Sequence, residues 1–161
     1  MSKRTEALAA RVEQGANALI TFAEKLSEAE WQTVCVDDER SVAVLAHHVA
    51  IAYPIEVDLL HALAAGKPIA LTWEVVKDAN SQHAIDNAGV DKQEVLTLLR
   101  KNSAYAANAI RELSDEQLDS AAPVSLNWDV PLTTQYFIEE HPITHPFRHM
   151  ASMRAALAAA T

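Results

Sequence analysis

The sequence predicts an all-α domain. Apolar residues recur at helical spacing in four long segments, only 3 of the 161 residues are glycine, and 50% are hydrophobic against 22% that are charged. Sparse glycine with abundant Ala, Leu and Glu favours helices over strands, and the overall balance is that of an ordinary globular chain. A chain of this length normally forms one core, so we expect a single domain over residues 1–161.

Net charge and cysteine content exclude several classes of partner. The 13 Lys and Arg against 22 Asp and Glu give a net charge of −9, with no basic run, which argues against nucleic-acid binding because phosphates need a basic surface. The first residues lack the apolar stretch of a secretion signal, and no window of about 20 residues is uncharged. We therefore expect a cytoplasmic protein with no membrane partner. Cys35 stands alone, which excludes an internal disulfide or a cysteine zinc site and indicates a reduced thiol.

Two long helices are expected in the first part of the chain. The first covers residues 2–26, and a capping-box pattern then opens a short helical turn at 27–31. The second covers residues 41–65, between a Ser41 cap and Gly66. The apolar stripe of the first helix consists of Leu8, Val12, Ala16, Leu19, Phe22 and Ala23. This stripe gives the first helix one face for a core.

Helical signals continue through the middle of the chain. A third helix is expected at residues 72–87, ended by Gly89. A fourth is expected at 91–113, where a capping box supplies its start, and another box at 114–117 opens a short helical piece. Neither an internal repeat nor an interdomain linker is visible in the sequence.

The last quarter of the chain combines a loop with a final helix. Residues 120–132 contain two prolines and are expected to form a loop, with a brief extended stretch at 124–128. The final helix is expected at residues 133–160, because its Ala-rich end favours helix.

Three histidines, His141, His145 and His149, lie within nine residues of this last helix. Residues four apart share one side of a helix about 6 Å apart along the axis, whereas residues eight apart are separated by about 12 Å. An i,i+4 pair can therefore bind one ion, but all three histidines cannot. A four-coordinate site needs a further protein ligand, with one position left for water if the site is catalytic. We expect that ligand to be an inward histidine on another helix.

The second helix offers His47 and His48, which point about 100° apart. The apolar side of this helix consists of Leu45, Val49, Ala52, Leu59 and Leu63. His48 falls about 50° from the middle of that side and His47 about 150° from it. The periodicity thus selects His48 as the inward residue and places His47 and His61 on the surface.

An inward histidine by itself is more often a hydrogen-bonded core residue than a ligand. The i,i+4 pair His145 and His149 on a separate helix changes this balance, because several imidazoles in one interior are typical of a metal site. The chain has neither an H-E-x-x-H nor an E-x-x-H motif, so the zincin and ferritin-like di-iron patterns do not apply.

Two segments resemble motifs of the DinB/YfiT-like proteins. Residues 40–49, RSVAVLAHHV, are similar to the second-helix motif of that family, and gapless placement puts its metal histidine on His48. Residues 145–154, HPFRHMASMR, are similar to its H-x-x-x-H segment. By this resemblance, His145 and His149 take the other two ligand roles.

The resemblance implies a four-helix bundle of up-down-down-up connectivity, often dimeric, in which three histidines hold a divalent metal. Family members include transferases and isomerases that use low-molecular-weight thiols. Arg40 stands where tryptophan is common, a departure that we expect to matter little. Pro142 and Pro146 lie inside the ligand helix, where each costs about 3 kcal/mol unless the helix opens. We expect a kink or a new helix start, which either aims His145 at the metal or leaves His141 as the replacement ligand.

Further polar residues share apolar faces. On the third helix, Asn80 and His83 lie on the side that Trp73 is expected to bury, and Glu56 falls within the apolar side of the second helix. These three polar residues are candidates to orient a substrate or move a proton. Alternatively, Asn80 and His83 bond to a neighbouring loop and Glu56 pairs with an arginine. A separate set of aromatic residues is expected in the core: Trp31, Trp128 and Tyr136.

The leading hypothesis is a metal-dependent transferase or hydrolase in which His48, His145 and His149 hold Zn²⁺ or Ni²⁺. The ion would activate a water or a thiol, with a low-molecular-weight thiol as a candidate cofactor and a homodimer as the expected assembly. The alternative is a non-catalytic dimeric bundle that binds a metal or small ligand. A third hypothesis is a pH-sensitive histidine surface without a metal. The sequence does not identify the substrate.

Overall fold

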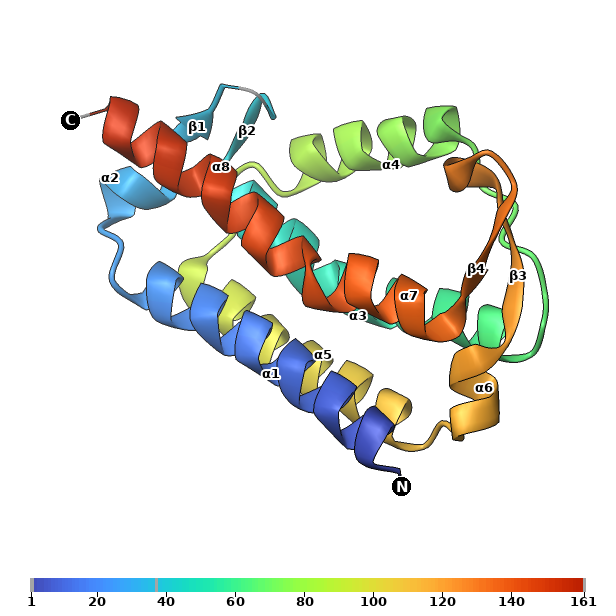
Figure 1. Ribbon diagram of the computed structural model, residues 1–161. Helices are drawn as coiled ribbons and strands as arrows, with labels where there is room; N and C mark the ends of the chain where they lie inside the picture. The colour runs from blue at the N-terminus through green and yellow to red at the C-terminus, as the bar shows by residue number, and fades with distance from the viewer. Residues whose placement is uncertain (1, 37, 161) are drawn as a thin grey trace.

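The computed structural model describes residues 2–36 and 38–160. Four helical segments form a bundle (Figure 1): α1 (Lys3–Glu24), α3 (Val42–Ala64), α5 (Lys92–Arg111), and a last segment that contains α7 (Thr134–Ile138) and α8 (His145–Ala159). In the figure, α1 and the last segment run one way, and α3 and α5 run the other way. The predicted up-down-down-up four-helix bundle is therefore confirmed.

Side-chain caps set the helix starts where the sequence predicts them. The hydroxyl of Ser41 accepts a hydrogen bond from the backbone N–H of Val44 at the start of α3. The carboxylate of Asp91 accepts one from the backbone N–H of Glu94 at the start of α5. The short helices α2 (Glu28–Trp31) and α6 (Asp115–Asp119) both begin with complete capping boxes. These bonds satisfy N–H groups that a helix leaves unpaired at its first turn. The predicted bounds of the first four long helices agree with the structure within two residues.

One hydrophobic cluster joins the bundle helices. Its largest fully buried side chains include Trp31, Tyr53, Leu19, Leu45, Leu60, Leu63, Leu96, Leu99, Ile110 and Met150. At the edge of the core, Arg111 of α5 donates to Glu6 and Glu13 of α1, which ties these two helices together. Among the described residues, α3 alone is long and apolar enough to cross a membrane, but 67% of its apolar window is buried in the bundle, as in the core helix of a soluble protein.

Helix α4 (Trp73–Asp86) lies outside the bundle, along the connection between α3 and α5 (Figure 1). None of its residues is buried, and Trp73 is 58% exposed. The expectation that Trp73 is buried is therefore wrong. The periodicity of α4 separates a more apolar side from a more polar one, but it does not show whether the apolar side is covered. Because α3 and α5 run in the same direction, the chain between them has to cross back along the bundle, and α4 forms part of this crossover outside the core.

Two small hairpins were not predicted. Strands β1 (Val34–Cys35) and β2 (Arg40–Ser41) pair just before α3. Strands β3 (Ala121–Val124) and β4 (Val130–Thr133) pair across a short 3-10 helix, η1 (Ser125–Asn127). The expected loop at 120–132 is thus mostly a hairpin, and of the stretch 124–128 only Val124 belongs to a strand.

The aromatic residues expected in the core divide between core and surface. Trp31 is buried, and its indole N–H donates to the carbonyl of Val90. Trp128 is 89% exposed at the tip of the β3–β4 hairpin, where its φ of 56° lies in the left-handed region. Tyr136 is 46% exposed. The expectation is therefore wrong for Trp128 and Tyr136, because both belong to the hairpin and the short helix that follows it.

Candidate metal centre

Helix α3 carries His48, whose side chain is half-buried. Its neighbours on that helix, Val49 and Ala52, are buried, so the core packing of α3 fixes the direction of the imidazole. The phase calculation from the sequence identified this side correctly. The other two ligand candidates, His145 and His149, lie one turn apart at the start of α8.

Two prolines shape the approach to α8. Residues Glu139–Ile143 form a π-helical turn, η2, and Pro142 lies inside it. The wider turn accommodates a proline that would clash with an α-helical backbone, and the hydroxyl of Thr144 donates to the carbonyl of Glu139. Pro146 falls in the first turn of α8, where its missing N–H has no intrahelical acceptor. The predicted interruption is confirmed, and a new helix begins at His145.

Gly15 of α1 allows the start of α8 to approach closely. A Cβ atom at this position would lie 3.0 Å from Cγ of Pro146 and 3.3 Å from the backbone oxygen of Ile143. Glycine weakens a helix interior relative to alanine by roughly 0.5–1 kcal/mol, so its presence here is explained by packing. Gly15 thereby sets the depth of the helix start that carries His145.

The three histidines converge as the sequence predicts. One nitrogen from each of His48, His145 and His149 lies within 4.8 Å of the others. The Nε2 atoms of His48 and His145 are 3.2 Å apart, and the ring centroids of His145 and His149 are 4.8 Å apart. We call these three residues the imidazole cluster. His141 lies outside it, with its ring stacked on Phe137 at 4.4 Å between centroids.

Glu56 lies behind His145. Its side chain is buried, as predicted, and Oε1 lies 3.0 Å from Nδ1 of His145. A carboxylate at this distance accepts the Nδ1–H proton, which leaves the lone pair on Nε2 facing His48. Glu56 therefore orients an imidazole; the structure places it against a histidine and not against an arginine.

Burial favours the neutral form of two histidines of the cluster, His48 and His149. Burial, followed by the charges of His145 and His149, lowers the pKa of His48 to about 2. Burial and the charge of His145 lower the pKa of His149 to about 4. Neutral imidazole is the form that binds metals, so His48 and His149 are in that form at neutral pH.

A second pair of histidines flanks the cluster. His47 is only 7% exposed, and its Nδ1 lies 2.8 Å from Nε2 of His83 on α4. The expectation that His47 lies on the surface is wrong, because α4 covers this side of α3. His61, by contrast, is exposed as predicted. The ring of His83 also lies edge to face with that of His48, at 5.8 Å between centroids.

Buried polar atoms without partners concentrate near the cluster. Within the described chain these atoms are Nη1 of Arg40, the hydroxyl of Tyr53, Oε2 of Glu56 and Nδ1 of His83. Such atoms are rare in protein interiors. Arg40 was not identified as a site residue from the sequence. The one feature that sets it apart in the sequence is that it stands where tryptophan is common in the DinB/YfiT-like proteins.

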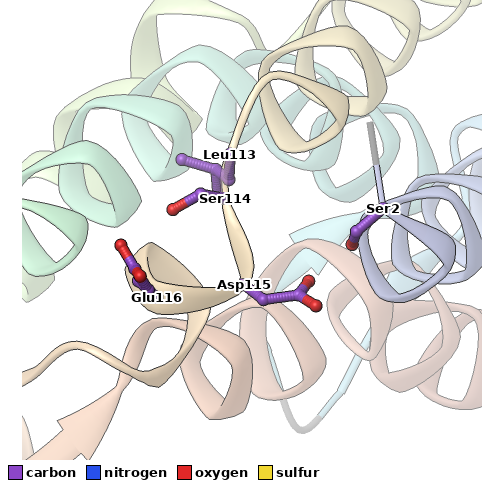
Figure 2. A pocket seen from close by; sticks show the side chains of 5 residues that line it. All are labelled: Ser2, Leu113, Ser114, Asp115 and Glu116. Atoms are coloured by element: carbon purple, nitrogen blue, oxygen red, sulfur yellow. The ribbon is translucent and has the colours of Figure 1, made fainter.

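Two of the hollows on the described surface bear on the predicted site residues. One, lined by Asn80 and Arg40 among others, lies between α4 and the β1–β2 turn. Figure 2 shows the other, between the start of α1 and the junction of α5 with α6; it contains Asp115 and Glu116 but no imidazole. The structure therefore places Asn80, which the sequence suggests as a pocket residue, beside the hollow that also contains Arg40.

The only cysteine, Cys35, is buried in β1. Burial and the neighbouring Asp38 raise the pKa of its thiol to about 11. A thiol in this environment is protonated at neutral pH and is a poor nucleophile. Any thiol chemistry at the cluster would need a thiol from outside the chain.

The fold and the imidazole cluster define a class of protein: a four-helix bundle with a candidate metal centre between its second and last helices. The chain belongs to the DinB superfamily, whose family model matches residues 11–153, a range that includes the whole cluster.

Among solved structures, the chain is similar to YfiT from Bacillus subtilis, which is described as a probable metal-dependent hydrolase with an unusual four-helix bundle topology. The two are 16% identical with a TM-score of 0.67, and the alignment covers 95% of this chain and 90% of that chain. This likeness shows a shared fold. No curated protein matches the chain.

Proposed function

We propose that this protein is a metal-dependent enzyme in which His48, His145 and His149 hold Zn²⁺ or Ni²⁺ and leave one position for an exchangeable ligand. The observation that carries the proposal is the convergence of three imidazoles from two distant segments. A single buried histidine is commonly a hydrogen-bonded core residue. Three that face one another are not readily explained in this way, because imidazoles without a shared ion gain little from such contact.

The donor set suits a borderline divalent ion. Nitrogen ligands about 2.0 Å from a tetrahedral zinc ion lie about 3.3 Å from one another, and the Nε2 atoms of His48 and His145 are 3.2 Å apart. The widest separation in the cluster is within 4.8 Å, which a rotation of an imidazole ring can close. The carboxylate of Glu56 on the far nitrogen of His145 is the partner that metal-binding histidines usually have.

The chain supplies orientation and a partly dry environment. Glu56 holds the Nδ1–H of His145, and the half-buried rings of the cluster limit access of bulk water. Asn80 is a candidate to orient a substrate at the mouth of the site, and His83 is a candidate to exchange a proton with it. When bound, the ion would lower the pKa of a water or a thiol and so provide a nucleophile at neutral pH.

Two reactions fit this chemistry. Hydrolysis is supported by the structural likeness to YfiT, which is described as a probable metal-dependent hydrolase. Thiol transfer is supported by the resemblance to thiol-dependent DinB members and by the inert environment of Cys35, which leaves the nucleophile to come from outside the chain. Both reactions need the same open position on the ion.

Titration of tag-free protein with Zn²⁺ and Ni²⁺, followed by calorimetry, tests the metal centre. We expect one ion per chain, with affinity at least 100-fold weaker in His48→Ala and His149→Ala because each removes a ligand. The matched controls are His61→Ala, on the same helix as His48 but exposed, and His141→Ala, outside the cluster; both should bind as the wild type does.

Unchanged affinity in His48→Ala would contradict the metal centre. Lost affinity in His141→Ala would instead make His141 the ligand. A cobalt-substituted sample distinguishes an enzyme from a binding module: an absorption spectrum that changes on addition of a thiol indicates an open position, whereas an unchanged spectrum indicates a closed shell and favours the non-catalytic alternative.

A further inference from the structure

Arg40 is a buried cation with an unused donor. Its side chain is 14% exposed, and Nη2 donates to Oδ1 of Asp38 at 3.1 Å. The other terminal nitrogen, Nη1, is buried and has no hydrogen-bond partner among the described residues. A guanidinium N–H enclosed without an acceptor is unusual, since buried polar groups are nearly always paired. An acceptor from outside the chain would satisfy it.

Arg40 borders a hollow of about 480 Å³ between α4 and the β1–β2 turn. This volume lies in the range of small-molecule sites. The polar lining consists of Asp38, Glu39, Arg40, Lys77, Asn80 and Ser81. The two carboxylates and two cations balance, so the hollow is neutral within a chain whose net charge is −9.

The hollow lies next to the imidazole cluster. Its lining includes Ser81 and Ala84 of α4, and between them in sequence is His83, whose ring lies edge to face with that of His48 at 5.8 Å between centroids. Arg40 belongs to β2, which leads directly into α3, the helix that carries His48. A molecule held in the hollow is therefore close to the cluster.

We propose that Arg40 binds a carboxylate of a small-molecule substrate, whose reacting group then reaches the imidazole cluster. Guanidinium and carboxylate groups match in charge and in hydrogen-bond geometry. The acidic surface as a whole repels anions, so selection of an acid would need a local cation such as this one. The inference rests on the proposed metal centre and names the class of substrate that it would accept.

Thiol probes of matched length test the proposal on cobalt-loaded protein, because a thiolate binds a borderline ion and changes its spectrum. The acids are 3-mercaptopropionate and 4-mercaptobutyrate, and the neutral probes are 3-mercapto-1-propanol and 4-mercapto-1-butanol. For the wild type, we expect the better acid to bind at least tenfold more tightly than the alcohol of equal length.

Arg40→Gln should reduce this preference to less than twofold and leave the affinity for the alcohols unchanged. The matched control is Arg148→Gln, which removes the same charge from a 59% exposed side chain on α8 that pairs with Glu140; it should keep the preference. Arg40→Lys keeps the charge but loses the planar guanidinium group, and it replaces Arg40→Gln in the test if that variant does not fold. We expect its preference for the acid over the alcohol to be at least threefold lower than that of the wild type.

Equal binding of acids and alcohols by the wild type would overturn the role of Arg40. A preference that survives in both Arg40 variants would also overturn it. Protein that takes up no cobalt would instead refute the metal centre itself, a result that the metal titration reveals before any thiol is added.

Discussion

Glu56 is a buried carboxylate whose Oε1 contacts a histidine of the cluster and whose Oε2 has no partner among the described residues. Burying a carboxylate costs free energy unless hydrogen bonds compensate for it. An apolar residue would suit this side of α3 equally well in packing terms. The carboxylate is therefore best explained by its contact with His145.

Replacing Glu56 with glutamine should weaken zinc binding about tenfold, and replacement with alanine about 100-fold, because outer partners orient and polarise metal-binding histidines. A competition titration against a chromophoric chelator measures this change. Asp58→Asn, at an exposed position on the same helix, is the control and should leave the affinity unchanged. Equal affinities in all four proteins would remove Glu56 from any role in metal binding.

His47 and His48 show what sequence reasoning resolves at this scale. The phase of one helix against its own apolar side identified His48, because α3 packs on the bundle core along that side. The same reasoning failed for His47, which is covered by α4. The apolar periodicity of α3 alone does not show where another helix packs against it. Arg40 was missed for a similar reason: its burial depends on a hairpin that was not predicted.

At the scale of the elements, the contact between α1 and the start of α8 is unusually close. Gly15→Ala should lower the free energy of unfolding by roughly 1–3 kcal/mol, because the added methyl meets a proline ring and a backbone oxygen that cannot easily move. Chemical denaturation measures the change, and a metal titration should show weaker binding as His145 moves outward.

Gly89→Ala is the matched control for this substitution. A Cβ atom there would meet nothing within 4 Å, so alanine should be neutral or stabilising by about 0.4–1 kcal/mol through its effect on the unfolded chain. If Gly15→Ala is as stable as Gly89→Ala and binds metal normally, close packing at residue 15 does not set the position of α8.

Helix α4 depends on few interactions. It has no buried residue, and the bond between His47 and His83 is its direct polar link to α3 among the described contacts. His83→Ala should therefore speed amide exchange in α4 about three- to tenfold, the effect of losing one net hydrogen bond. Hydrogen exchange with mass spectrometry measures this, with exposed Ser81→Ala as the control. Unchanged exchange in α4 would show that other contacts hold it.

Long helices were predicted well because caps and periodicity are local signals. The β3–β4 hairpin was not, since its strands are short and contain Pro123 and Pro131, and its pairing is completed by a bridge between Ile69 and Val124 far along the chain. The prediction that Trp128 is buried was wrong for the same reason. A large apolar side chain is usually expected in the core, but Trp128 lies in the turn of a hairpin that was not predicted.

At the scale of the whole molecule, a bound ion should stabilise the fold. Zinc at about 100 times its dissociation constant contributes about 2.7 kcal/mol, which corresponds to a rise in Tm of roughly 5–10 °C for a chain of this size. Differential scanning calorimetry with and without EDTA measures the shift. His149→Ala should show none, and an equal shift in this variant would indicate that zinc binds elsewhere.

The expected homodimer stays a prediction, which sedimentation equilibrium tests directly. We expect a mass of twice 17.6 kDa. A measured mass of 17.6 kDa at protein concentrations of tens of micromolar would contradict the homodimer.

The sequence distance across the imidazole cluster has a practical consequence. His48 and His145 are 97 residues apart, so a shared ion would close a loop that covers most of the chain. The unfolded chain would lose conformational entropy on closing this loop, and it would therefore bind the ion more weakly than the folded protein does. Ion occupancy would then report the folded fraction of a preparation. Release of zinc to a fluorescent indicator would then follow the separation of α8 from α3 as the protein unfolds.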